Sequence, residues 1–282
     1  ALPVMFSSSL LFFDEWFGRR FASALDEGTI TWLNNARRLV LLPASMVGQA
    51  AGQALFPFVA AMIVESRRDE LQHTMASIVR ATAALGVVAA FALASLAVPL
   101  VGAIFVRGAY TPADAAITAQ LLAVMAWSVP AWALYAVALR ALHAAQRTWL
   151  SSAIGLSTLV PSYFAYAALA ESAGARGLAA ATPVCLTVAA LVLLAVMSRA
   201  LRVSTVGPLV RGLAEGVAVG VAGAAAALGV AAALDTRATV EGALSATAFG
   251  AAAAVVLALL PGPAGDVVRV RLRRVRARLS RG

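Results

Sequence analysis

Charged side chains stand inside two apolar stretches near the start of the chain. Asp14 and Glu15 lie within LLFFDEWFGRR, and Arg37 and Arg38 lie within GTITWLNNARRLVLLPASMVGQAAGQALFP, which runs from Gly28 to Pro57. A charge at the centre of a membrane helix costs at least ~2.5–3.5 kcal/mol on insertion scales, so it rarely faces lipid. We therefore expect these groups to border a polar cavity inside a membrane bundle.

Depth along the helices suggests how these charges meet. At about 1.5 Å per residue, Asp14 lies about 20 Å along the first apolar segment, and Arg38 lies about 12–15 Å below the outer end of the second. Antiparallel neighbours would bring the two to similar depth as an ion pair, which removes much of the desolvation cost of each. A purely structural ion pair is one interpretation. However, the arginines of this zone outnumber Asp14 and Glu15, and surplus guanidinium suits a phosphate ligand; they are Arg19, Arg20, Arg37 and Arg38.

The overall composition is that of an integral membrane protein. Of the 282 residues 62% are hydrophobic and only 12% are charged, with a mean hydropathy of +0.88; soluble domains contain about twice that share of charge. The net charge of +9 comes from 22 basic residues, all of them arginine. Most arginines lie between apolar segments or near the C-terminus, so membrane topology and anionic lipid explain them better than nucleic acid.

Eight apolar segments are each long enough to cross a bilayer core of about 30 Å. They cover residues 1–25, 29–62, 76–99, 115–139, 150–170, 177–198, 209–234 and 241–260. With the C-terminal tail placed in the cytoplasm, fifteen arginines fall on the inside and five on the outside. This bias predicts a multi-pass protein with both ends cytoplasmic. Arg80 and Arg140, near segment ends, are expected to extend toward the interface.

Residues that could support catalysis or metal binding are scarce. Cys185 is the single cysteine, and His73 and His143 are far apart, so neither a disulfide nor a metal site is predicted. No catalytic motif of the hydrolase, zinc-protease, nucleotide-binding or dinucleotide-binding kinds is present. We expect a protein that is not an enzyme and that needs no cofactor. The chain opens with Ala1 inside an apolar run, so we also expect that a further segment precedes it.

Four sequence blocks resemble one protein family. The stretch FASALDEGTITWLNNARRLVLLPASMVGQAAGQALFP resembles the seventh-to-eighth helix region of the MurJ/MviN lipid II flippases, within the multidrug/oligosaccharidyl-lipid/polysaccharide exporter superfamily. The matching positions are Phe21, Ala22, Ser23, Leu25, Gly28, Thr31, Leu33, Ala36, Arg38, Leu39 and Pro43. The later blocks LVGAIFVRGAYTPAD, ALRALHAAQRT and GARGLAAAT are similar to family motifs in the same order. In the first of these the similarity lies in Phe105, Gly108, Tyr110, Thr111 and Asp114.

The resemblance implies an all-α polytopic helix bundle of about eight transmembrane helices. Residues 1–200 would be the second six-helix lobe, 201–262 two additional C-terminal helices, and 263–282 a basic cytoplasmic tail, with the first lobe missing from this sequence. The implied activity is movement of the lipid-linked peptidoglycan precursor across the bacterial inner membrane by alternating access between lobes. The implied partners are that precursor, the missing lobe and anionic lipids at the tail, with no nucleic acid. Arg38 matches the family's cavity arginine, which is expected to meet the diphosphate.

Departures from the family pattern leave alternatives open. The candidate substrate-binding residues are Asp14, Asn34, Asn35, Arg37 and Arg38. Where the family has an acid before its arginine, this chain has Arg37. Some members hold sodium between an acid on the seventh helix and Asn or Asp on the eleventh, but the fifth segment here has neither, so no sodium site is predicted. One other hypothesis is an exporter of another lipid-linked saccharide. A second is an exporter of cationic drugs, which the positive charge of the arginines disfavours. A third is a non-transporting scaffold of cell-wall synthesis.

Overall fold

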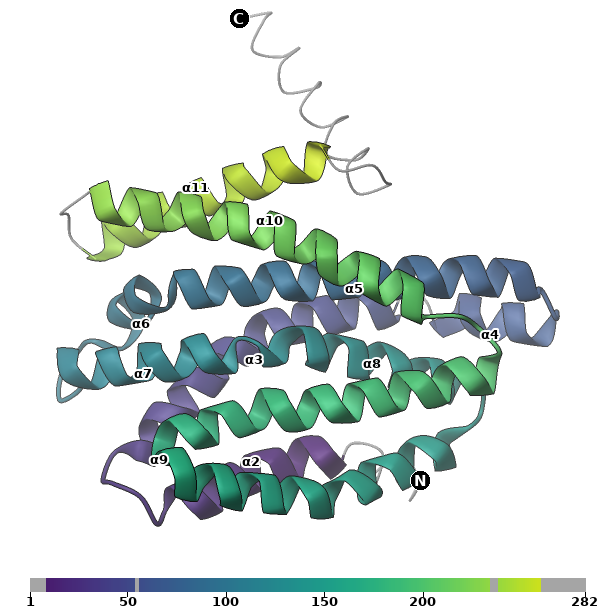
Figure 1. Ribbon diagram of the computed structural model, residues 1–282, viewed down its shortest axis with the longest axis horizontal. Coiled ribbons are helices and arrows are strands. Elements are labelled where there is room, and N and C mark those ends of the chain that lie inside the picture. Colours follow the sequence, from purple (N-terminus) through teal and green to yellow (C-terminus); the bar gives the residue numbers. More distant parts are fainter. Residues whose placement is uncertain (1–8, 54–55, 234–237, 260–282) are drawn as a thin grey trace, which may run out of the picture.

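The computed structural model describes residues 9–53, 56–233 and 238–259 (Figure 1). This part of the chain contains ten helices and no strands, which confirms the predicted all-α class. The helices are α2 (Ser9–Ala22), α3 (Thr29–Gln53), α4 (Phe56–Val64), α5 (Arg68–Ser95), α6 (Ala97–Phe105), α7 (Pro112–Met125), α8 (Ser128–Ala144), α9 (Thr148–Leu201), α10 (Val206–Ala233) and α11 (Ala238–Leu259).

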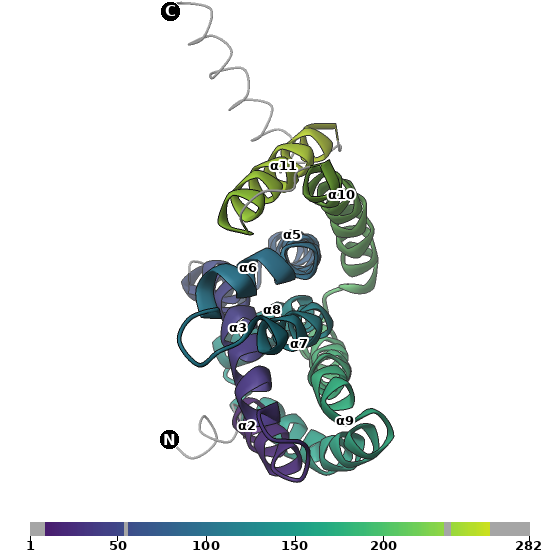
Figure 2. The ribbon, with the colours of Figure 1, turned by 90° about the vertical axis from the view of Figure 1, so that its left-hand side faces the viewer.

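The helices run roughly along one direction and pack in layers. Viewed end-on, α10 and α11 lie on one side and pack against α5 and α6 (Figure 2). The middle of the bundle is formed by α3, α7 and α8. The other side is formed by α2 and α9. The second apolar segment forms α3 and α4, and the fourth forms α7 and α8, which are bent by 44° where they join. The predicted segments therefore correspond to helices that are often broken in two.

Helix α9 reverses direction part-way along its length. Gly174 has φ 55° and ψ −132°, a left-handed conformation that glycine adopts without steric cost. Close packing follows the reversal, because a Cβ on Gly177 would lie 1.8 Å from the carbonyl oxygen of Leu169. The two limbs of α9, residues 148–173 and 175–201, are the fifth and sixth predicted segments joined without a loop.

Three helices among the described residues are long and apolar enough to cross a membrane: α5, α9 and α10. The bent pair of α7 and α8 raises that number to four. Because α9 doubles back at Gly174, it supplies two limbs. The count of eight spans remains a prediction.

Successive connections lie at opposite ends of the bundle. The α2–α3 and α6–α7 connections and the reversal in α9 lie at one end, and the α4–α5, α8–α9 and α9–α10 connections lie at the other (Figure 1). The second end carries exposed arginines, namely Arg67, Arg68, Arg147, Arg199 and Arg202. This alternation is the arrangement that the predicted arginine bias requires; which end faces the cytoplasm stays a prediction, and the tail from 263 to 282 lies outside the described residues.

Helix α10 packs on α5 through glycines and one ion pair. A Cβ on Gly212 would lie 2.3 Å from the carbonyl oxygen of Arg80, and one on Gly216 would lie 2.8 Å from that of Ala84. Glu215 lies between these glycines and accepts two hydrogen bonds from the Arg80 guanidinium, with Nε at 2.9 Å. The sequence places Arg80 near a segment end, and its extension toward the interface stays a prediction; in the structure its guanidinium binds Glu215, 135 residues away, with the two side chains 31% and 23% exposed.

Substitution of Gly212 tests this close approach. We expect Gly212→Ala to lower the free energy of unfolding by roughly 1–3 kcal/mol, because the methyl group must push α10 away from the α5 backbone. Gly229→Ala on the same helix is the matched control, since a Cβ there meets nothing within 4 Å. Denaturation of the purified protein in detergent measures both, and equal stability of the two variants would contradict the packing described.

Candidate functional site

Helix α3 has a packed face and an outward face. The packed side chains recur every three or four residues, the spacing of one helix face; Thr29, Leu33, Ala36, Val40 and Ala44 are all buried. The same spacing places a second set opposite, where side chains are exposed or partly exposed; it comprises Thr31, Asn35, Arg38, Leu42 and Ser45. We call this second set the outward stripe of α3. The two adjacent arginines therefore face different surroundings.

Arg37 points from α3 toward α2 and forms an ion pair with Asp14. Its Nη1 donates to the Asp14 carboxylate, and its Nη2 lies 3.4 Å from both the Asp14 carbonyl oxygen and Thr182 Oγ1. The side chains are 17% and 5% exposed. The sequence predicted an acid–arginine pair at this depth with Arg38 as the partner; that partner was wrong, because Arg37 is the arginine that turns inward.

Two further members of the network, Tyr166 and Thr182, come from α9. The Tyr166 hydroxyl donates to the other carboxylate oxygen of Asp14 and lies 2.8 Å from Thr182 Oγ1. Tyr166 and Thr182 are buried and come from the two limbs that meet at Gly174. The sequence reasoning missed both residues. Their only signal is a polar group in an apolar helix, since a buried tyrosine hydroxyl usually finds a hydrogen-bond partner.

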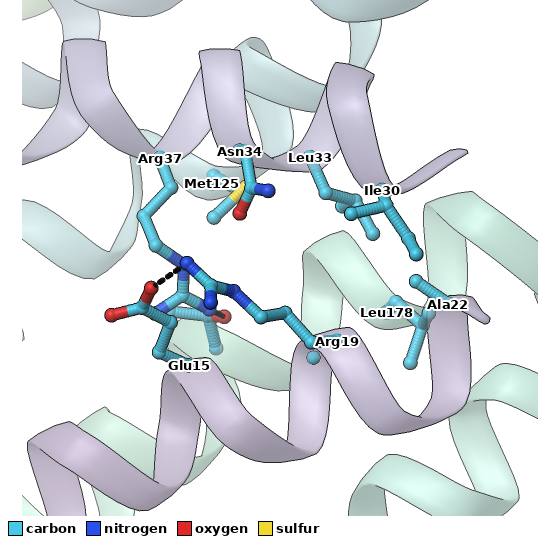
Figure 3. Close-up of a pocket in the computed structure, with 11 residues that line it drawn as sticks. Glu15, Arg19, Ala22, Ile30, Leu33, Asn34, Arg37, Met125 and Leu178 are labelled. Atoms are coloured by element: carbon cyan, nitrogen blue, oxygen red, sulfur yellow. Dashed lines mark hydrogen bonds and ion pairs between the residues drawn. The ribbon is translucent and has the colours of Figure 1, made fainter. Parts of the chain in front are cut away.

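A small pocket that is open to the surface lies beside this network (Figure 3). Its polar lining comes from Glu15, Arg19, Asn34, Arg37 and Thr182. Figure 3 shows the Arg19 and Arg37 side chains reaching into the space between α2 and α3. Glu15 accepts a hydrogen bond from Arg19, so each of these guanidinium groups has its own carboxylate. The pocket is therefore close to electrically neutral.

The surplus positive charge expected in this zone consists of Arg20 and Arg38. Neither forms an ion pair within the described part of the chain. Arg20 lies near the end of α2, whereas Arg38 lies about 14 Å along α3 at about 1.5 Å per residue. The next exposed residues along α3 are apolar, namely Leu41, Leu42 and Met46. Because an arginine at this depth is costly to expose to lipid, we expect the outward stripe to border water or protein.

A hydrogen bond ties the start of α3 to the start of α7. Trp32 Nε1 donates to Asp114 Oδ1 at 3.0 Å. Asp114 also forms a capping box with Thr111, in which each side chain accepts from the other residue's backbone N–H at 3.2 and 2.9 Å. The Tyr-Thr-x-x-Asp part of the second sequence block is thus explained by helix capping and by this tether.

Removal of Asp114 tests the tether. We expect Asp114→Ala to reduce the free energy of unfolding by about 0.5–2 kcal/mol, the usual range for a lost helix cap. Asp26→Ala is the control, because Asp26 is exposed in the α2–α3 turn and only its backbone oxygen accepts a hydrogen bond there; it should stay within about 0.5 kcal/mol of the parent. A chemical denaturation series compares them, and an Asp114→Ala protein as stable as the parent would rule out the tether's contribution.

Metal-binding residues are not grouped in the described part of the chain. No cluster of three or more His, Cys, Asp or Glu side chains there could hold a metal ion, and Cys185 is a buried free thiol. His73 is exposed, and His143 lies 3.3 Å from Ser151 Oγ. The polar chemistry of this fold therefore centres on the arginines and carboxylates of α2 and α3.

Comparison with known proteins places these features in a family. A family model described as Lipid II flippase MurJ matches residues 1–249. A protein of Vibrio cholerae named probable lipid II flippase MurJ is 28% identical over 181 residues, which make up 64% of this chain and 34% of that protein. One of the same name from Bdellovibrio bacteriovorus is 32% identical over 128 residues, covering 45% of this chain and 24% of the relative.

A solved structure shares the fold. The lipid II flippase MurJ in an inward closed conformation superposes with a TM-score of 0.72 at 15% identity, over 90% of this chain and 51% of that one. The chain therefore spans about half the length of that structure, and its aligned stretches span 34% and 24% of the two relatives.

Proposed function

Because the chain belongs to the lipid II flippase MurJ family, we propose that it carries the lipid-linked peptidoglycan precursor lipid II across the bacterial inner membrane. On this proposal the protein is a multi-pass transporter and catalyses no covalent chemistry. The observation that supports it most is Arg38, an arginine about 14 Å along α3, exposed on the outward stripe and without a carboxylate partner among the described residues.

Guanidinium chemistry suits the diphosphate of such a lipid. Arginine stays protonated and offers donors in a planar fork that matches two phosphate oxygens at once. We assign the main contact to Arg38, with Asn35 beside it on the outward stripe as a further hydrogen-bond donor. Asn34 lines the neighbouring pocket with Arg37, and we assign these two, with Asp14, to the inner edge of the substrate site.

The outward stripe would then form one wall of a chamber that opens to each side of the membrane in turn. We propose that residues 1–200 form one moving lobe, that a first lobe preceding this sequence supplies the opposite wall, and that 201–262 form an attached helix pair. The tail from 263 to 282 would lie on anionic lipid in the cytoplasm. Rocking of two units about a site at mid-membrane is the general scheme for such transporters.

Depletion of the protein in its own cell tests the proposal. Lipid-linked precursor should accumulate in the inner leaflet and become inaccessible to a membrane-impermeant reagent added outside. Normal outer-leaflet precursor during depletion would contradict the proposal. A scaffold that only recruits other proteins would depend on its surface but would be insensitive to neutralising Arg38, so the Arg38 variants discussed below separate the two hypotheses.

A further inference from the structure

Asp14 is the residue of this fold at which a transported ion or proton would be expected. Among the side chains whose burial the structure describes, it is the one acidic or basic group that is buried, at 4% exposure. Intramembrane carboxylates commonly mark ion pathways and proton relays, and the family resemblance implies sodium at an acid of this helix in some members. The surroundings of Asp14 decide whether a cation can bind there.

The oxygen atoms that could bind a cation are already used by protein groups. One Asp14 carboxylate oxygen accepts from Arg37 and the other accepts from Tyr166. The Asp14 carbonyl and Thr182 Oγ1 both lie 3.4 Å from Arg37 Nη2. The guanidinium thus occupies the position among these oxygens that a bound cation would need, and the residues present do not fit a sodium ion.

On the α2 side, the Arg37 guanidinium lies opposite Gly18, where an added Cβ would be 3.4 Å from Arg37 Nη2, an ordinary van der Waals contact. Buried apolar side chains of α2, α3 and α9 pack around the network, among them Phe17, Leu33 and Leu178. The charge of arginine is permanent, because its side chain is not deprotonated in proteins.

We propose that Arg37 is a fixed internal counter-ion of Asp14. The Asp14 cluster, which comprises Asp14, Arg37, Tyr166 and Thr182, therefore neither loads nor releases sodium or a proton. It holds α2, α3 and both limbs of α9 as one electrically neutral unit. This inference stands whether or not the protein transports lipid, because it concerns only how the lobe neutralises its buried acid.

Thermal unfolding of the purified full chain in detergent tests the inference. The parent protein should have the same melting temperature in sodium chloride and in choline chloride at equal ionic strength, because no site at Asp14 can bind sodium and gain stability by mass action. Arg37→Ala should lower the melting temperature, and either sodium or a lower pH should restore part of it by neutralising Asp14. The double variant Asp14→Asn/Arg37→Gln should lose that dependence.

Two outcomes would overturn the inference. One is a parent protein that sodium stabilises and whose response disappears in Asp14→Asn/Arg37→Gln, which would show an exchangeable site at Asp14. The other is an Arg37→Ala protein that unfolds at the same temperature as the parent and responds to neither sodium nor pH. If Arg37→Ala does not fold, the parent and the neutral double variant decide the question. A sodium response of equal size in these two proteins must come from a site other than Asp14 and supports the inference.

Discussion

Replacement of Arg38 by alanine should abolish movement of the lipid-linked precursor while leaving the folded protein intact. The side chain is exposed on the outward stripe and has no ion-pair partner in the described part of the chain, so its loss leaves no buried group unsatisfied. Surface substitutions of this kind usually change the free energy of unfolding by no more than about 0.5 kcal/mol. A large loss of function with little loss of stability would therefore report ligand contact rather than folding.

Two further variants make this result specific. Arg38→Lys keeps the charge but loses the planar fork, so it should retain only part of the activity if the diphosphate is bound through two oxygens. Arg199→Ala removes an exposed arginine from the last turn of α9, at the end of the bundle away from the α2–α3 connection. The Arg199→Ala protein should transport normally. Each allele is placed at the chromosomal locus, and outer-leaflet precursor is measured at matched expression. Normal transport by Arg38→Ala would refute the role assigned to Arg38.

The largest effect on stability is expected at the Asp14–Arg37 pair. Removal of one member leaves an uncompensated buried charge, which costs about 3–5 kcal/mol in comparable pairs. We therefore expect Asp14→Ala to lower the free energy of unfolding by about that amount. Both side chains are mostly buried, at 5% and 17% exposure, so solvent relieves little of the cost.

The neutral double variant separates charge from packing. Asp14→Asn/Arg37→Gln should recover much of the stability lost in the single variants, because replacing both members of a buried pair is often close to neutral. Unfolding of the parent, Asp14→Asn, Arg37→Gln and the double variant by denaturant gives the interaction free energy from the double-mutant cycle. Additive losses would mean that the two side chains contribute independently, contrary to the contacts observed.

The sequence was sufficient to predict the fold class, the position of most helices and the presence of an acid–arginine pair between the first two apolar segments. It was not sufficient to say which arginine forms the pair. Adjacent residues on a helix point about 100° apart, from 3.6 residues per turn. Polar residues occur on several faces of α3, so only the neighbouring helices decide which of Arg37 and Arg38 turns inward.

The remaining partners are distant in sequence and follow no local motif. Tyr166 and Thr182 meet because α9 reverses at Gly174, and Glu215 reaches Arg80 because glycines let α10 approach α5. Both contacts depend on tertiary packing between helices that pattern reasoning treats separately.

The adjacent arginines suggest a division of roles. Arg37 is held by Asp14 and helps to fix α3 against α2 and α9, so that Arg38 faces outward from a firmly placed helix. A binding group on a rigid support loses less freedom when it meets its ligand. On our proposal the fixed pair and the unpaired arginine together present a positive charge at one defined place on the chamber wall.

Water access at position 38 tests this proposal most directly. Cys185 is the single cysteine, so Arg38→Cys can be labelled in a Cys185→Ala background with a membrane-impermeant thiol reagent, with Val160→Cys on an exposed apolar position of α9 as the control. We predict that Arg38→Cys is labelled, that lipid-linked diphosphate precursor slows the labelling, and that Val160→Cys is not labelled. An Arg38→Cys protein that resists the reagent as fully as Val160→Cys would place this position in lipid or dry protein and contradict the proposal.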